Sequence, residues 1–252
     1  MIPNIFHFIY FYDERNKENI FPLSHYLAIK SASVINKPEK IYFYLNTEPS
    51  GEWWERAKEI VEVKHISPPT EVFGRTLYHP AHKSDVARIY ILIENGGIYL
   101  DFDIICKKSF MPLLNFNYVM GKQGKYRKMG LCNGVILSEK NAEFLKLWLE
   151  EYRNFRSKGH DKYWVESSTE KPLMLSKKYP DLIHVEPFDS FHFPLYYPWS
   201  LRNLFVRNKN FPNAYCHHLW ESESREKYLN KLTPEFIKKV DTTYNIIARR
   251  LL

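Results

Sequence analysis

The chain has 252 residues, of which 44% are hydrophobic and 26% charged, a globular composition that supplies a sizeable core for one domain spanning residues 1–252. The formal net charge of +7 suits an anionic partner such as a phosphate, a nucleic acid or an acidic membrane surface, and does not choose among them. Three widely spaced cysteines without a C-x-x-C pair argue against a disulfide framework and for a reducing compartment.

No apolar run approaches the roughly 20 residues that a membrane-spanning helix needs. The N-terminal stretch is apolar but lacks the basic region and the small-residue cleavage site of a signal peptide, so we interpret it as a strand. We therefore expect a cytoplasmic or membrane-peripheral protein without a signal peptide or a transmembrane segment.

The first hundred residues alternate between segments typical of strands and of helices. The predicted strands cover 4–11, 40–46 and 98–105, and the predicted helices cover 23–35, 50–62 and 82–97. This alternation predicts an α/β fold with a mostly parallel central sheet flanked by helices. Right-handed crossovers then place the carboxyl ends of the strands along one edge, where open α/β sheets bind their ligands.

After about residue 110 the pattern is less regular. A short strand and a long helix are predicted within 135–155, the aromatic and proline-rich segment 188–205 fits no regular element, and 233–252 predicts a final helix. Thr233 is a suitable N-cap for that helix, with Pro234 at its first position. An apolar stripe runs along it: Phe236, Val240, Tyr244, Ile247 and Leu251. The stripe either packs against the rest of the domain or lies on an anionic membrane or a partner.

The helix predicted at 82–97 has an apolar face and, near its start, a separate polar one. Four of its residues recur at helical spacing and would face the core: Val86, Ile89, Tyr90 and Ile93. Ser84 can cap the amino terminus, and Asp85 and Arg88 share another stripe near the helix start. Gly96 provides a stop signal, and Gly97 lets the chain reverse closely against its neighbour.

The following strand, "GGIYLDFD", delivers two carboxylates to its end. Alternate side chains of a strand share a face, so Asp101 and Asp103 lie on one face with α-carbons about 6.6 Å apart, at about 3.3 Å per residue. This spacing is awkward for two direct ligands of one ion in an ideal strand. It favours a division of labour, in which one aspartate binds an ion and the other orients a hydroxyl or a water.

Two acids at a buried strand end are costly unless a cation neutralises them, and hard oxygen ligands favour Mg²⁺ or Mn²⁺, which recruit substrate phosphates. On its own, a D-x-D tripeptide also fits a turn cap or a surface ion pair. The combination with S-D-x-x-R, and with the glycine pair before the strand, is far more specific.

This combination, "KSDVARIYILIENGGIYLDFD", resembles the DXD sugar-binding region of glycosyltransferase family 32. That family includes the yeast-type initiating mannosyltransferases, and it shares its motif with the α1,4-galactosyltransferases and the large clostridial glucosylating toxins. The opening "IPNIFHFIYF" is similar to the family's first strand, with Tyr10 where tryptophan is usual. "AYCHHLWES" is similar to its terminal H-x-W element, which places His218 and Trp220 on the matching positions.

The resemblance implies a GT-A fold and a retaining, divalent-metal-dependent transfer of a hexose from a UDP- or GDP-sugar to a glycan, lipid or protein acceptor. It also implies that Asp103 ligates Mn²⁺ or Mg²⁺ bridging the two donor phosphates, with His218 as a second protein ligand. Asp101 would contact ribose or sugar hydroxyls and reach the metal through water. Asp85 and Arg88 would hold the donor sugar.

Further donor-site candidates follow from the same resemblance. Tyr10 or Phe11 would lie near the base, and Trp220 beside the donor. Asn133 would face the donor sugar, with a turn residue as the alternative interpretation. The metal and basic groups would stabilise the leaving diphosphate. No protein nucleophile is evident. The resemblance implies a reaction on the front face of the sugar, with the leaving phosphate as the base.

Other residues have competing interpretations. His79 and His82 precede the helix start without partners at zinc spacing, which favours surface or capping roles. Cys216, His217 and His218 could suggest a soft-metal site, but no second ligand pair is visible. Trp199 either stacks on an acceptor sugar or packs within its loop.

Two other functions compete with sugar transfer. A phosphatase of the haloacid-dehalogenase type also uses D-x-D after an apolar strand. Such an enzyme normally has threonine or valine at the position of Ile105, and its pair of aspartates normally lies near the N-terminus. A non-catalytic module binding sugar nucleotides, nucleic acid or a membrane surface is suggested by the net charge. Basic residues are interleaved with acidic ones, so we expect no nucleic-acid partner, and peripheral membrane contact stays open. Polysaccharide biosynthesis is the biological role that fits a hexosyltransferase.

Overall fold

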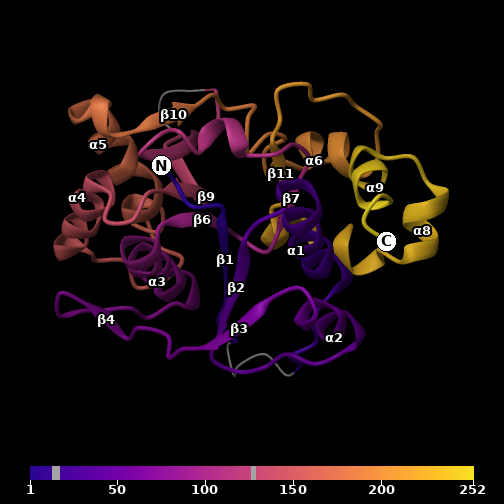
Figure 1. The fold of residues 1–252 in the computed structure, drawn as a ribbon, viewed down its shortest axis with the longest axis horizontal. Coiled ribbons are helices and arrows are strands. Elements are labelled where there is room, and N and C mark those ends of the chain that lie inside the picture. The colour runs from indigo at the N-terminus through magenta and orange to yellow at the C-terminus, as the bar shows by residue number, and fades with distance from the viewer. Residues whose placement is uncertain (13–17, 126–128) are drawn as a thin grey trace.

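A mixed sheet occupies the centre of the molecule in the computed structural model, which describes residues 1–12, 18–125 and 129–252 (Figure 1). Within these ranges, seven strands pair in the order β10-β8-β9-β6-β1-β2-β3. Their bounds are β1 (Ile5–Tyr10), β2 (Lys40–Leu45), β3 (Glu62–His65), β6 (Gly97–Leu100), β8 (Tyr118–Lys122), β9 (Leu131–Ser138) and β10 (His184–Glu186). Only β9 runs antiparallel to its neighbours, β6 and β8. The predicted mostly parallel sheet is therefore confirmed.

Short strands and helices surround this sheet. Two small ribbons are formed by β4 (Glu71–Val72) with β5 (Arg75–Thr76), and by β7 (Ile104–Cys106) with β11 (Cys216–His218). The helices are α1 (Leu23–Asn36), α2 (Glu52–Lys58), α3 (Pro80–Asn95), α4 (Glu143–Glu151), α5 (Lys171–Lys178), α6 (Pro198–Phe205), α7 (Glu221–Ser224), α8 (Pro234–Lys239) and α9 (Thr243–Ala248). In the described part of the chain, none of them has the length and apolarity that crossing a bilayer requires.

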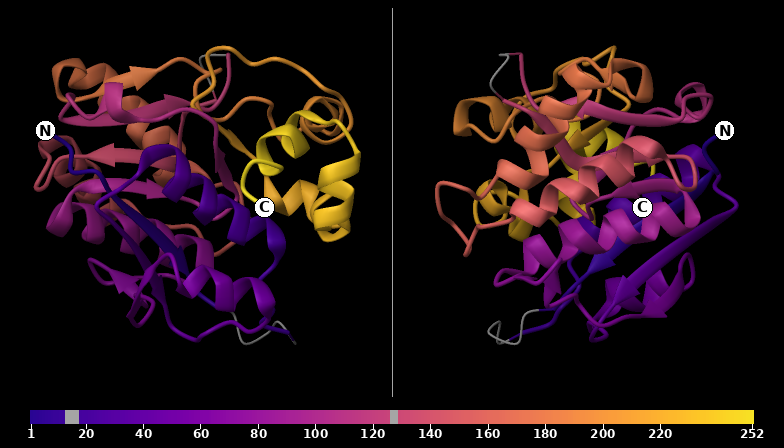
Figure 2. Two further views of the ribbon diagram at one scale, coloured as in Figure 1. Left: turned by 45° about the vertical axis from the view of Figure 1, so that its right-hand side comes forward. Right: turned by 90° about the vertical axis from the view of Figure 1, so that its left-hand side faces the viewer.

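Alternate residues of β1 divide the core into two layers. Phe6 and Phe8 pack with the residues of α1, whereas Ile9 packs with those of α3. Figure 1 shows α3, α4 and α5 on one side of the sheet, and α1 with α6, α8 and α9 on the other; Figure 2 shows the same separation. Because both faces are covered, the central strands are buried on both sides, as the alternation of strands and helices predicted.

The first predicted elements are confirmed with small changes at their ends. The strands predicted at 4–11 and 40–46 and the helix predicted at 23–35 correspond to β1, β2 and α1. The helix predicted at 50–62 is shorter, because α2 begins after Gly51 and ends at Lys58.

The helix predicted at 82–97 is present as α3, but it begins earlier. Pro80 takes the first helical position, where its missing N–H removes no bond, and the side chain of His79 accepts the Ala81 N–H at 3.2 Å. The prediction that Ser84 caps this helix is therefore wrong, and the capping role considered for His79 is confirmed. Tyr90, predicted to face the core, is 45% exposed, because it lies about 100° around the helix from the buried Ile89.

The turn from α3 into β6 is as close as its two glycines predicted. Gly96 and Gly97 have φ values of +66° and +103°. A β-carbon on Gly97 would lie 2.5 Å from the carbonyl oxygen of Ile5. His7 holds this turn from β1, since its Nε2–H donates to the Gly96 carbonyl at 2.8 Å and its Nδ1 accepts from the Tyr44 hydroxyl at 3.2 Å.

The continuous strand predicted at 98–105 is wrong. The chain leaves β6 after Leu100, makes a turn in which the Ile104 N–H donates to the Asp101 carbonyl at 3.0 Å, and enters β7 in a different sheet. Phe102, between the two aspartates, packs against the core on the α1 side, with its ring centre 4.4 Å from that of His25. The two aspartates therefore belong to a turn, and the strand spacing does not apply to them.

The second half of the chain departs further from the predictions. Segment 188–205 was assigned no regular element, yet Pro198 starts α6 and Leu201 and Leu204 bury its inner face. The single amphipathic helix predicted at 233–252 is two short helices, α8 and α9. The Thr233 cap with Pro234 at the first position is confirmed.

The break between α8 and α9 removes the continuous apolar stripe. Thr242 accepts the Asn245 N–H at 3.0 Å and so caps a new helix, α9. Tyr244 and Leu251 are buried against the α1 side of the core, whereas Phe236 and Val240 are exposed. This segment therefore has no continuous apolar stripe of the kind that suggested a membrane-binding helix. The packing interpretation fits Tyr244 and Leu251, which are buried.

Candidate active site

A cleft of about 570 Å³ opens at the edge of the sheet where β1 and β6 end. The amino-terminal end of β9 reaches the same edge because β9 runs antiparallel to β6, and the amino terminus of α3 faces the cleft from one side. Eight of the nine candidate residues line it: Phe11, Asp85, Arg88, Asp101, Asp103, Asn133, His218 and Trp220. The ninth, Tyr10, does not, and its hydroxyl donates to Asn19 Oδ1 at 2.6 Å.

The turn after β6 and the far end of the chain meet at Asp103. Strand β11 pairs antiparallel with β7, with His218 opposite Ile104. The Leu219 N–H donates to the Asp103 carbonyl at 2.8 Å, and the Glu221 N–H donates to Asp103 Oδ2 at 2.9 Å. These bonds hold the carboxylate of Asp103 against the segment that follows β11.

Donor atoms of Asp101, Asp103 and His218 lie within 4.8 Å of one another. His218 Nε2 is 3.2 Å from Asp103 Oδ2. Burial alone would raise the pKa of the Asp103 carboxyl, but the charge and hydrogen bond of His218 and the Glu221 N–H hold that pKa below its usual value. The same interaction, against the effect of burial, holds the pKa of His218 well above its usual range. Two carboxylates and an imidazole so arranged suit one divalent ion such as Mg²⁺ or Mn²⁺.

This arrangement removes the spacing argument for a division of labour between the two aspartates, while their separate roles stay a prediction. In an extended strand only one aspartate would reach an ion directly. The turn at Phe102 brings both carboxylates toward His218, so the structure allows Asp101 and Asp103 to be ligands together.

Arg88 links the remaining acids into one buried network. Its guanidinium lies 3.2 Å from Asp85 Oδ1 and 3.3 Å from Asp101 Oδ1, and its Nη1 donates to the Asn133 carbonyl at 2.8 Å. The Asn133 amide in turn donates to Asp85 Oδ1 at 2.7 Å. Burial raises the pKa of Asp85, although Arg88 opposes that shift. Ser84 anchors the other side of Arg88 through its hydroxyl and carbonyl oxygens.

Tyr99 and Gly134 place the carboxylate of Asp101. The Tyr99 hydroxyl donates to Asp101 Oδ1 at 2.6 Å, and the Tyr99 ring lies 4.3 Å from the centre of the Arg88 guanidinium. A β-carbon on Gly134 would lie 2.8 Å from Asp101 Oδ2 and 3.4 Å from His218 Cε1. Only glycine at position 134 therefore leaves the carboxylate in this position.

His218 and Trp220 act as a stacked pair at the cleft floor. Their rings are 3.9 Å apart and nearly parallel, and the indole N–H of Trp220 donates to the Pro194 carbonyl at 2.8 Å. His217 points elsewhere, since its Nδ1–H donates to the Phe193 carbonyl at 3.0 Å. Burial lowers the pKa of His217 to about 4.

Several residues of the cleft were not predicted from the sequence. Trp164 lies on the wall beside His79 and His82, and Glu221 and Arg225 lie beyond Trp220. Glu221 and Arg225 are joined at 2.9 Å, and their i, i+4 spacing directly after H-x-W is a signal that could have been used. Trp164 has no comparable signal, because its place depends on contacts between distant segments.

A second buried group lies behind the cleft floor. Donor atoms of Cys132, His192 and His218 lie within 4.8 Å of one another, and Cys132 Sγ is 4.0 Å from His218 Nδ1. Burial alone would raise the pKa of the Cys132 thiol, but His192 and His218 lower it to about 6. Cys106, Cys132 and Cys216 are free and buried, which agrees with the absence of a disulfide framework predicted from the sequence.

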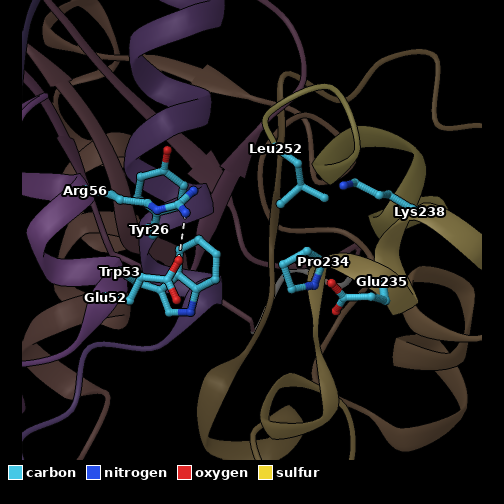
Figure 3. A pocket seen from close by; sticks show the side chains of 8 residues that line it. All are labelled: Tyr26, Glu52, Trp53, Arg56, Pro234, Glu235, Lys238 and Leu252. Carbon is cyan, nitrogen blue, oxygen red and sulfur yellow. Dashed lines mark ion pairs between the residues drawn. The ribbon is translucent and has the colours of Figure 1, made fainter.

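Two surface features are separate from this site. A cleft of about 420 Å³ lies between α2 and the C-terminal segment, and in it Arg56 pairs with Glu52 at 2.7 Å and covers Trp53. Figure 3 shows the side chains that line this cleft. This cleft shares no lining residue with the cleft at the sheet edge. Trp199 lies in the first turn of α6, is 67% exposed, stacks on Tyr197 and lies outside the sheet-edge cleft. The packing within a loop that the sequence suggested for it is therefore absent.

The chain resembles known glycosyltransferases in sequence. A family model described as "Glycosyltransferase sugar-binding region containing DXD motif" matches residues 16–120. Glucan organizing enzyme 1 of Cryptococcus neoformans var. grubii is 30% identical over 262 residues, which cover 99% of this chain and 70% of that protein. Lactosylceramide 4-alpha-galactosyltransferase of Mus musculus is 41% identical over 70 residues, which cover 27% of this chain and 18% of that protein.

The fold has solved counterparts. Mouse xyloside xylosyltransferase 1 aligns with a TM-score of 0.50 at 15% identity, covering 84% of this chain and 96% of that chain. At that identity the likeness concerns the fold, and it agrees with the GT-A architecture expected from the sequence. One relative matches nearly the whole chain, and the family model matches the D-x-D segment. This chain therefore belongs to the glycosyltransferase family whose sugar-binding region contains the DXD motif.

Proposed function

We propose that this protein is a metal-dependent, retaining hexosyltransferase that uses a UDP- or GDP-sugar as donor. The observation that carries the proposal is the meeting of Asp101, Asp103 and His218, with donor atoms within 4.8 Å, on the floor of a cleft in a glycosyltransferase fold. A nucleotide sugar carries a diphosphate, and a carboxylate-rich cation site is the usual partner of such a group.

The ion site fits Mn²⁺ or Mg²⁺ by its chemistry. Asp101, Asp103 and His218 would hold the ion, which would supply positive charge to the leaving diphosphate. Asp103 is fixed in place by the Glu221 N–H, and Asp101 by Tyr99 and Arg88. Because these side chains are already held by their own partners, they lose little conformational freedom when a substrate binds. The site is preorganised in this sense.

Asp85 and Arg88 would position the donor sugar. Both are buried at the amino-terminal part of α3, and Asn133 ties Asp85 to β9. We assign their polar atoms to sugar hydroxyls, and Phe11 and Trp220 to the base and to the apolar face of the donor, because both line the cleft. Retention follows from a route in which the acceptor attacks the face that the leaving phosphate occupies, with that phosphate taking the acceptor proton.

The acceptor is a glycan, a lipid or a protein. The match over nearly the whole chain is to a protein named a glucan organizing enzyme, whereas the galactosyltransferase relative is named for lactosylceramide. The first name favours a polysaccharide acceptor and a role in polysaccharide biosynthesis. We also propose that residues 1–252 act as one catalytic domain, because β11 and the residues after it complete a site built mainly from the first 133 residues.

A panel of UDP- and GDP-hexoses tests the proposal. Release of nucleoside diphosphate should require Mn²⁺ or Mg²⁺ with at least one donor, and the anomeric configuration of the transferred sugar, read by NMR, should match that of the donor. Asp103→Asn should abolish release while far-UV circular dichroism and the melting temperature stay close to the wild type. Asp241→Asn, on an exposed aspartate that pairs with Arg249, is the matched control and should keep full activity. Release that is undiminished in EDTA, or full activity of Asp103→Asn, contradicts the metal-dependent mechanism.

A further inference from the structure

The imidazole of His218 separates two sets of donor atoms. Its Nε2 faces the carboxylate of Asp103 at 3.2 Å, and its Nδ1 faces the sulfur of Cys132 at 4.0 Å. The outer set, toward the cleft, is rich in carboxylate oxygen. The inner set consists of Cys132, His192 and His218, all three buried, of which Cys132 and His218 line the cleft and His192 lies behind them.

His192 is the unusual member of the inner set. It is 0% exposed, and neither of its ring nitrogens makes a hydrogen bond of normal geometry within the described residues, although the Cys132 thiol is close enough to interact with the ring. Buried polar groups normally find partners, so an imidazole with two unpaired nitrogens in the interior calls for an explanation. One of these nitrogens lies within 4.8 Å of both the Cys132 sulfur and a nitrogen of His218.

We propose that Cys132, His192 and His218 form an inner site for a thiophilic divalent ion, with Zn²⁺ as the natural occupant. One sulfur and two imidazole nitrogens are a donor set that favours zinc over magnesium or manganese. In a tetrahedral zinc site with bonds of about 2.3 Å to sulfur and about 2.0 Å to nitrogen, a sulfur and a nitrogen ligand lie about 3.5 Å apart. The observed 4.0 Å between Cys132 Sγ and His218 Nδ1 needs only a small contraction.

The surroundings of the inner site match this assignment. Cys132 lines the cleft whereas His192 does not, so the ion would lie just beneath the cleft floor with a fourth position toward the cleft. Cys132 lies on β9, His192 on the segment after β10, and His218 on β11. An ion there would tie together three segments that are distant in the chain. On binding, the Cys132 thiol loses its proton to solvent and the sulfur becomes a thiolate ligand. His218 likewise releases its Nδ1 proton to solvent, and where an ion also occupies the outer set it releases the Nε2 proton as well and bridges the two ions as an imidazolate.

Cobalt spectroscopy tests the inner site independently of sugar transfer. Co²⁺, added alone to the metal-free full-length protein, should produce a thiolate-to-metal charge-transfer band in the near ultraviolet at one equivalent. Cys132→Ser should abolish the band, and His192→Gln should weaken Co²⁺ affinity at least about 10-fold. Cys106→Ala, at another buried free cysteine, and Asp103→Asn, which removes a donor of the outer set only, should both keep the band.

Several results would overturn the proposal. The proposal is wrong if the wild-type protein lacks the charge-transfer band, or if the band survives in Cys132→Ser or disappears in Cys106→Ala. It is also wrong if His192→Gln binds Co²⁺ with unchanged affinity. If a variant does not fold, X-ray absorption of the Zn²⁺-loaded wild type decides. A sulfur neighbour at about 2.3 Å supports the inner site, and a shell of oxygen and nitrogen alone refutes it.

Discussion

Replacing Gly134 by alanine should reduce sugar transfer while leaving the fold intact. The new β-carbon would lie 2.8 Å from Asp101 Oδ2, closer than carbon and oxygen approach without a bond. The backbone of Gly134 lies outside the positive-φ region, so alanine is conformationally acceptable there. The atom that must move is therefore the end of the Asp101 side chain.

The size of the effect follows from what Asp101 loses when it moves. Its Oδ1 accepts from the Tyr99 hydroxyl at 2.6 Å and lies 3.3 Å from Arg88. A hydrogen bond to a charged group contributes about 1.5–3 kcal/mol, which corresponds to a loss of about 10- to 150-fold in turnover if the contact is needed in the reacting complex. The free energy of unfolding should fall by about 0.5–2.5 kcal/mol, because the lost hydrogen bond is offset by only about 0.4–1 kcal/mol from the restriction that alanine places on the unfolded chain.

The assay is release of nucleoside diphosphate from the best donor, measured beside urea denaturation. Gly121→Ala is the matched control, because its β-carbon would meet the ring of Phe191 at 2.7 Å and should lower stability by about 1–3 kcal/mol. In an Asp101→Ala background, Gly134→Ala should cause no further loss of turnover. Undiminished turnover in Gly134→Ala, or an equal further loss in the Asp101→Ala background, refutes the reasoning.

Three further outcomes are expected. Arg88→Ala should lower the free energy of unfolding by about 3–5 kcal/mol in urea denaturation, because it leaves the buried Asp85 without its cation. A loss below about 1 kcal/mol would contradict this. Burial lowers the pKa of His7 to about 4 from an unfolded value of about 6.5, so its contribution of about 3 kcal/mol is present above pH 6.5 and is lost as the pH falls toward 4. The loss of unfolding free energy between pH 7 and pH 5 should therefore be smaller in His7→Gln, and an equal loss would show that His7 is not responsible. Deleting 233–252 exposes the core that Tyr244 covers, so the truncated chain should aggregate or melt at a lower temperature, and an unchanged melting temperature would contradict this.

Local signals in the sequence were sufficient for the elements that lead to the site. The helical spacing of 82–97, the glycine pair after it and the D-x-D tripeptide each act over a few residues, and α3 and β6 follow them. The resemblance to a known family then supplied residues from β9 and β11, which no local pattern in this chain connects to the D-x-D segment.

What local signals could not supply depends on contacts between distant segments. The turn at Phe102 forms because β7 pairs with β11 rather than extending β6, and that pairing partner lies beyond residue 215. The end of α8 is likewise decided by tertiary contacts, since the side chain of Asn245 donates to the Val240 carbonyl and that of Arg249 to the Ile237 carbonyl. Thr242, three residues before Asn245, was a usable cap signal that the longer apolar stripe obscured.

The bond from the Glu221 N–H to Asp103 joins residues 118 positions apart, and it has a consequence for when the site can exist. Closing a loop of that length is an entropic cost that folding meets late, after the local contacts of the sheet and its helices. During synthesis, the cleft has no His218 until the segment that carries β11 has left the ribosome. A partly made chain can therefore hold a formed sheet edge and both aspartates without a complete site for the donor. A ligand whose binding needs His218 would therefore stabilise chains that include residues 216–221 over chains that end before them.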